Sequence, residues 1–184
     1  MKLSWGRKSR NRAAVSRAGF SLVELLVTIG ILSMIIGLAV WSLQGTLPNW
    51  RLNNAASEVT SMFQYARSEA ARNNVRAFVS FSGIGSSTAS KIDVYLDVDR
   101  NGNLDAADTL LKSVTIPMKY PRAYIASVTD AAGAITTATM RADGTMTGVT
   151  APVTVTVDSL ATTTPSQYSV VVILSGAARV EPVP

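Results

Sequence analysis

The chain has no cysteine and no histidine among its 184 residues. Without cysteine no disulfide can form, so the folded part must be held together by side-chain packing alone. The two absences also exclude nucleophile–base pairs built on cysteine or histidine, and zinc sites with thiolate or imidazole ligands. No other convergent acid–base set stands out. We therefore predict a protein that is not an enzyme and that uses no cofactor.

Charge is also missing from two stretches of the sequence. The first 19 residues contain no acid, and residues 25–50 contain no charged side chain at all. The uncharged run from Leu25 to Leu43 approaches the roughly 20 apolar residues that a helix needs to cross a membrane. Basic residues that precede such a span keep the N-terminus in the cytoplasm. Six of them lie here: Lys2, Arg7, Lys8, Arg10, Arg12 and Arg17.

The high isoelectric point comes mostly from this basic leader. The chain has 17 basic and 12 acidic residues, and without the six leader residues 11 basic ones remain. The rest of the chain is therefore close to neutral. A nucleic-acid-binding role inferred from net charge would rest on residues that precede Gly19.

The residues Gly19-Phe20-Ser21-Leu22-Val23-Glu24 join the leader to the apolar run. This order, followed by a full span, resembles the class III signal of type IV pilins and type II secretion pseudopilins. The resemblance implies that a prepilin peptidase cuts between Gly19 and Phe20, that Phe20 becomes N-methylated, and that the apolar helix stays on the mature protein.

The same resemblance implies a GspH/FimT-type subunit, a minor pseudopilin or minor pilin. Such a protein is a structural part of a periplasmic filament in the type II secretion or type IV pilus system. It is a single-pass protein of the inner membrane with its C-terminal domain in the periplasm. Its implied partners are other pilins or pseudopilins, the prepilin peptidase and the inner membrane.

Glu24 has two explanations that can coexist. Ser21 and Glu24 have the spacing of a capping box, in which both side chains satisfy backbone N–H groups at a helix start. However, a carboxylate at the centre of a span costs about 2.5–3.5 kcal/mol, and less near its end, so a partner is expected. The resemblance supplies one, the amino terminus of a neighbouring mature subunit, and thereby a role for Glu24 in subunit assembly.

A helical pattern continues beyond the apolar run. Apolar residues recur at spacings of three and four, which predicts one buried stripe, and Asn73 is a plausible last residue of the helix. Gly45 and Pro48 predict a kink or local melting between Gln44 and Pro48. The stripe consists of Leu52, Ala55, Ala56, Val59, Met62, Phe63, Ala66 and Ala70.

After residue 75 the pattern changes to short β-branched and aromatic runs, which predict strands. One long helix followed by strands predicts an α+β fold, with the periplasmic half of the helix on an antiparallel sheet or sandwich. The resemblance implies the same arrangement. The predicted organisation is a cleaved leader (1–19), a transmembrane helix (20–47), a periplasmic helix (48–74) and a β-rich domain (75–184). The predicted strands are 75–81, 92–98, 109–116, 123–128, 134–140, 153–157, 168–174 and 177–180.

The segment from Asp97 to Asp108 resembles a calcium loop in its spacing. It has oxygen side chains at loop positions 1, 3, 5, 9 and 12 and a glycine, Gly102, at position 6. Position 12 is an aspartate rather than the longer glutamate, and strands rather than helices are predicted on both sides. Turn chemistry selects the same residues: Asn101-Gly102 can supply positive φ, and the aspartates can accept from backbone N–H groups. The sequence favours this turn, with no metal, and leaves calcium as the second possibility.

The C-terminal stretch Ser175 to Val180 offers the alternative function. It is similar to the ending of FimT-like proteins, some of which bind DNA through a Gly-Arg-x-Arg pattern in DNA uptake. In this chain Ala177 replaces the first arginine of the pattern, and only the second, Arg179, remains. One phosphate contact is far fewer than the roughly six to ten that give strong electrostatic binding, so we expect DNA not to be a partner.

Overall fold

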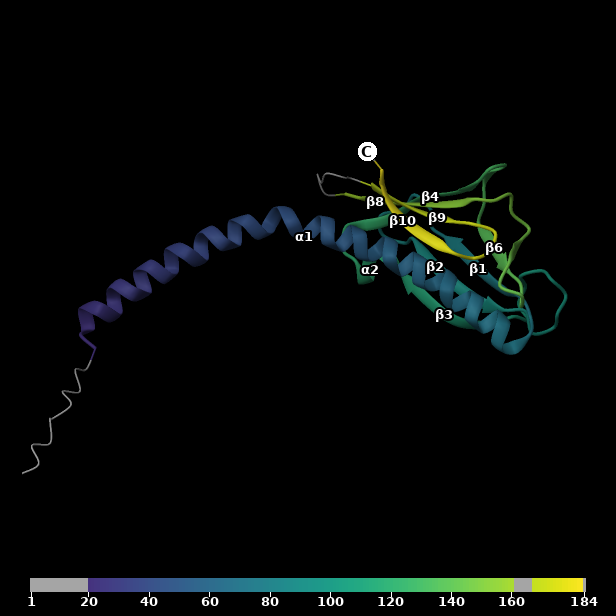
Figure 1. Cartoon of the computed structure of the whole chain (residues 1–184), viewed down its shortest axis with the longest axis horizontal. Coiled ribbons are helices and arrows are strands. Elements are labelled where there is room, and N and C mark those ends of the chain that lie inside the picture. Colours follow the sequence, from purple (N-terminus) through teal and green to yellow (C-terminus); the bar gives the residue numbers. More distant parts are fainter. Residues whose placement is uncertain (1–19, 161–166, 184) are drawn as a thin grey trace, which may run out of the picture. The chain divides into compact units, whose positions relative to one another are not determined.

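The computed structural model describes residues 20–160 and 167–183, and the leader with Gly19 lies outside them. Contacts divide the chain into two units, residues 1–41 and 42–184, which are described separately. The helix α1 (Leu22–Asn73) contributes to both units, and the second also contains the short helix α2 (Ile116–Lys119) (Figure 1). The strands are β1 (Ala77–Ser82), β2 (Lys91–Leu96), β3 (Thr109–Thr115), β4 (Ala123–Asp130), β5 (Gly133–Ala134), β6 (Thr137–Met140), β7 (Met146–Thr147), β8 (Val153–Ser159), β9 (Gln167–Val172) and β10 (Ala178–Val183).

The strands form two antiparallel sheets of five. One has the order β3-β2-β1-β6-β7 and the other β10-β9-β8-β4-β5. Alternation is clear in β8, where Val153, Val155 and Val157 are buried while Thr154 and Thr156 are partly exposed. The α+β class predicted from the sequence is confirmed.

The second half of α1 is the helical layer of this fold. All eight residues of the predicted stripe are fully buried. Asn74 follows the helix with a φ of 53°, and the side-chain amide of Asn73 donates to the Glu69 carbonyl oxygen at 2.9 Å. Asparagine tolerates the left-handed conformation that ends many helices, which explains why α1 ends where the sequence predicts.

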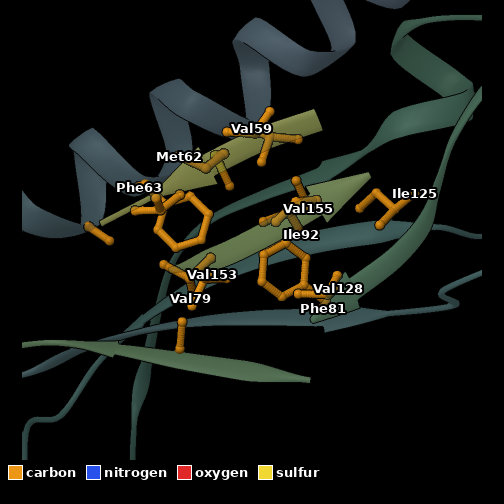
Figure 2. Packing of buried hydrophobic residues seen from close by; sticks show 14 of the residues in the cluster. Val59, Met62, Phe63, Val79, Phe81, Ile92, Ile125, Val128, Val153 and Val155 are labelled. Carbon is orange, nitrogen blue, oxygen red and sulfur yellow. The ribbon is translucent and has the colours of Figure 1, made fainter. Parts of the chain in front are cut away.

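Side chains from the helix and from both sheets meet in one hydrophobic cluster (Figure 2). Val59, Met62 and Phe63 of α1 point toward the strands, and the rings of Phe63 and Phe81 lie 6.1 Å apart between centroids. With no disulfide in the chain, this shared core holds the second unit together.

Three details differ from the sequence-based expectation. The segment 134–140, predicted as one strand, divides into β5 and β6, which belong to different sheets, because the chain crosses between the sheets near Ile135. The short elements β7 and α2 were not predicted, since two to four residues carry no readable period. Helix α1 also continues through Pro48, so of the predicted kink or local melting, the melting is wrong.

Candidate functional site: the exposed apolar end of α1 and two carboxylate clusters

The first part of α1 is apolar on every side. Leu22–Ala39 has a mean hydropathy of 2.4 and is long and apolar enough to cross a membrane, and none of it is buried within the structure. Phe20, just before the helix, is 81% exposed. A core helix of similar composition would be covered by its own fold. None of the described residues packs against this segment, so we expect lipid or other helices to bury its apolar surface.

The polar side chains of this segment satisfy themselves on its own backbone. Thr28 Oγ1 donates to the Leu25 carbonyl oxygen and Ser33 Oγ donates to that of Ile29, both at 2.8 Å. Such internal bonds remove the cost of an unsatisfied hydroxyl in an apolar medium. The hydroxyls therefore do not oppose insertion into a membrane.

Glu24 is the exception. Ser21 Oγ accepts from the Val23 N–H at 3.3 Å, which is an N-cap hydrogen bond although a capping box would use the Glu24 N–H. Within the described residues the Glu24 carboxylate makes no side-chain hydrogen bond or ion pair, so the reciprocal bond of the capping box is not formed, and Glu24 is exposed. A carboxylate in an otherwise apolar helical segment, without a partner among the described residues, is available for a partner from another molecule.

A second acid of the same helix, Glu58, is held entirely within its own unit. Its Oε2 accepts from Lys119 Nζ at 2.8 Å and from the Tyr120 hydroxyl at 3.1 Å, and Lys112 Nζ lies 3.5 Å from Oε1. Burial alone would raise the pKa of Glu58, but the hydrogen bonds from Lys119 and Tyr120 outweigh it and hold that pKa below its ordinary value. This cluster fastens α1 to β3 and α2.

The third feature is the 12-residue connection between β2 and β3. Strands flank it, as predicted, but it is too long for a two-residue hairpin turn, and positive φ occurs at Arg100 (59°) and Gly102 (78°) rather than at Asn101. Aspartates do accept from backbone N–H groups here: Asp99 Oδ1 from Asn101 at 3.1 Å and Asp97 Oδ2 from Gly102 at 3.1 Å. Both distances agree with the predicted turn chemistry.

This connection also gathers three carboxylates. One oxygen each of Asp97, Asp99 and Asp108 lies within 4.8 Å of the other two. Asp97 is 1% exposed. Burial, and next the adjoining carboxyl of Asp99, raises the pKa of Asp97 above its ordinary value. Crowded carboxylates around a buried one are electrostatically unfavourable unless something positive lies among them.

The C-terminal arginine of the DNA-uptake alternative is paired within its own strand. Arg179 on β10 forms an ion pair with Glu181, two residues further along. Alternation in a strand places both side chains on the same face, where the carboxylate offsets the charge that would meet a phosphate. The fold therefore adds nothing that favours DNA binding at this end of the chain.

A surface cleft of about 540 Å³ lies at one end of the second unit, lined by residues 74–76 and 141–143. Its charged side chains are Arg76, Arg141 and Asp143. Hydrogen bonds from Thr145 hold the pKa of Asp143 below its ordinary value, so Asp143 is not suited to act as a base near neutral pH. No nucleophile–base pair lines the cleft among the residues that the structure describes.

No curated protein matches this chain. Two crystal forms of the type IV minor pilin FimU from Pseudomonas aeruginosa (strain PAO1) were found among solved structures, with 18% and 19% sequence identity. They cover 72% and 71% of this chain, and 88% and 93% of their own, with a TM-score of 0.49 in both cases. A likeness of that size is too weak to support an inference.

The family comparisons are more informative. The prokaryotic N-terminal methylation motif matches residues 15–40, which include Gly19, Phe20 and Glu24. The family described as type II transport protein GspH matches residues 55–177, which is most of the second unit and more than half of the chain. The two matches join in one chain a pilin-type N-terminus and a GspH domain. The chain belongs to the GspH family of pilin-like structural subunits.

Proposed function

We propose that this protein is a minor subunit of a periplasmic filament in the type II secretion or type IV pilus system. The leader, residues 1–19, is removed by a prepilin peptidase between Gly19 and Phe20, and Phe20 is then N-methylated. Residues 20–47 stay in the inner membrane until assembly, residues 48–74 continue the helix into the periplasm, and residues 75–184 form the periplasmic domain. The work of the protein is structural.

One observation carries the proposal. An apolar helical segment, uncovered by its own fold, contains a single carboxylate, Glu24, which has no partner among the described residues. A filament supplies what the isolated chain lacks, because packed neighbouring helices cover the apolar surface and a neighbouring amino terminus can pair with the acid. After cleavage that amine belongs to Phe20, four residues from Glu24.

The alternative is a membrane-anchored protein that keeps its leader or is cut by a conventional signal peptidase. The intact mass of the protein purified from the membranes of a host with an active prepilin peptidase separates the three cases. We expect a chain that begins at Phe20 with one added methyl group. A mature protein that begins near residue 40, or one that retains residues 1–19, would sink the proposal.

A matched variant shows whether the peptidase is responsible. Replacing Gly19 with a larger residue, as in Gly19→Val, should block removal of the leader while membrane insertion persists. Gly30→Val, further along the same helix, should be processed normally, since a Cβ there would meet no atom within 4 Å. Equal processing of both variants would show that the cut is not at Gly19.

A further inference from the structure

The three carboxylates in the β2–β3 connection have more negative charge than the turn needs. The turn uses Asp97 Oδ2, which accepts from the Gly102 N–H, and Asp108 Oδ2, which accepts from the Asp105 N–H at 3.0 Å. The other oxygen of each residue, Oδ1, is buried and has no hydrogen-bond donor. Asp97 as a whole is almost completely buried. A buried carboxylate oxygen without a donor is unfavourable, so these atoms require an explanation.

Neighbouring side chains do not provide it. Among the described residues, no lysine or arginine lies within ion-pair distance of Asp97, Asp99 or Asp108. The Asn101 amide donates to Asp99 Oδ2 at 2.7 Å and to Asp105 Oδ2 at 2.6 Å, which draws a fourth acid toward the group. The connection therefore brings several anionic oxygens close together, and none of the three carboxylates has an ion-pair partner among the described residues.

We propose that Asp97, Asp99 and Asp108 bind a calcium ion. The three residues occupy positions 1, 3 and 12 of the loop, which are positions of carboxylate ligands in calcium loops. The donors are all hard oxygens, with no sulfur or imidazole, which suits calcium or magnesium rather than a transition metal. The sequence alone favoured a metal-free turn; the buried, unpartnered oxygens of Asp97 and Asp108 reverse that preference.

Arg76 is the basic side chain that offers an alternative. Its guanidinium lies so close to Gly102 that a methyl group there would overlap it. It forms no ion pair with the three carboxylates. If Arg76 neutralised the loop in place of calcium, the wild type would show no calcium response, and Arg76→Gln would lower the melting temperature in the chelator.

Calcium is preferred over magnesium because of the irregular donor set. Calcium accepts six to eight oxygen ligands in flexible geometry, whereas magnesium requires near-ideal octahedral geometry and releases its water reluctantly. The short side chain at position 12 reduces the number of oxygens that the loop can supply, so the affinity should be modest. We expect a Kd of about 10⁻⁴–10⁻³ M, the range of extracellular calcium modules.

The test uses the full-length chain in detergent micelles, first stripped of metal with a chelator. Calcium at about ten times its Kd should raise the melting temperature by about 3–6 °C, and magnesium at the same concentration should raise it less. Titration calorimetry supplies the Kd. The calcium response should disappear in Asp97→Asn and in Asp99→Asn, and it should survive in Arg76→Gln and in Asp143→Asn, an aspartate of a different turn.

Stability without calcium distinguishes a ligand from a turn residue. Asp97→Asn removes one of three crowded negative charges, so in the chelator its melting temperature should equal or exceed that of the wild type. Asp99 is exposed, so Asp99→Asn should fold normally. This variant keeps the test valid if Asp97→Asn, at the buried position, does not fold. The proposal would be overturned if the wild type did not respond to calcium. It would also be overturned if Asp97→Asn and Asp99→Asn responded to calcium as strongly as the wild type. An equal response to magnesium would overturn the choice of calcium.

Discussion

The two ends of helix α1 form one continuous element but have opposite environments. Leu22–Ala39 is exposed on every face, whereas from Leu52 to Ala70 one stripe of eight residues is fully buried and the other faces are polar. An all-round apolar helix can be covered only by lipid or by several other helices, but a single stripe is covered by one surface of its own domain. The difference in pattern therefore separates the part of the helix that assembles with other molecules from the part that builds the fold.

The largest expected effect on stability lies in the buried half. Phe63→Ala should lower the free energy of unfolding of the second unit by about 3–5 kcal/mol, because the ring is fully buried against Phe81 and its loss leaves a cavity. Leu32→Ala, in the exposed half, should change it by less than about 0.5 kcal/mol. Urea unfolding followed by circular dichroism gives both values. Similar losses in the two variants would erase the contrast between the halves.

The second effect concerns assembly. Glu24→Ala should be cleaved and inserted normally, since removing a carboxylate makes insertion easier, yet its recovery in sheared filaments should fall by about tenfold or more because the neighbouring amine loses its partner. Thr28→Ala, one helical turn further on, is the matched control, because its hydroxyl bonds only to its own backbone. Equal recovery of Glu24→Ala and wild type at equal membrane abundance would leave Glu24 without a role in assembly.

The third prediction contrasts Glu24 with Glu58, the acid that has its partners within its own chain. Glu58→Gln should cost about 1–2 kcal/mol, because the charge-assisted hydrogen bond from Lys119 and the ion pair with Lys112 are lost. Glu69→Gln, whose partner Arg72 is 3.7 Å away and largely exposed, should cost less than about 0.5 kcal/mol. Urea unfolding at neutral pH measures both variants.

The cost of Glu58→Gln should also depend on pH. The folded-state pKa of Glu58 lies below its ordinary value of 4.5, so its contribution is fully present above pH 4.5 and is lost as the pH falls through the folded-state pKa. The difference between wild type and Glu58→Gln should therefore shrink in acid. A difference that stays constant from neutral pH down into that range would show that the carboxylate charge is not what fastens α1 to β3 and α2.

The smallest effect belongs to the start of the helix. Ser21→Ala removes the acceptor for the Val23 N–H and should cost about 0.5–1 kcal/mol of local helix stability without changing the unfolding of the second unit. Amide hydrogen exchange of residues 22–25 in micelles reports it directly. Ser33→Ala, whose hydroxyl bonds to Ile29 within the helix, should leave that exchange unchanged. Faster exchange throughout the second unit would contradict a local cap.

Most of the architecture could be predicted because its signals are local. The spacing of Leu52 to Ala70 identified the buried stripe completely, and alternating valines and threonines identified β8. The crossing of the chain from β5 to β6 could not be predicted, because only two residues separate the two short strands and no turn signal stands between them; only the sheet pairing distinguishes them. The Glu58 cluster was also missed, since Lys112 and Lys119 lie more than 50 residues away along the chain and no local pattern links them.

The sequence by itself determined the pilin-type N-terminus, the apolar span and the α+β class, because each depends on the order or period of neighbouring residues. Only the tertiary structure decided that Glu24 has no side-chain partner among the described residues while Glu58 has three. It also decided that the loop aspartates converge, with Asp97 buried and one of its oxygens left without a donor. The physical reason is that burial and pairing depend on which residues, far apart in the sequence, the fold brings into contact. Local sequence patterns do not show these contacts.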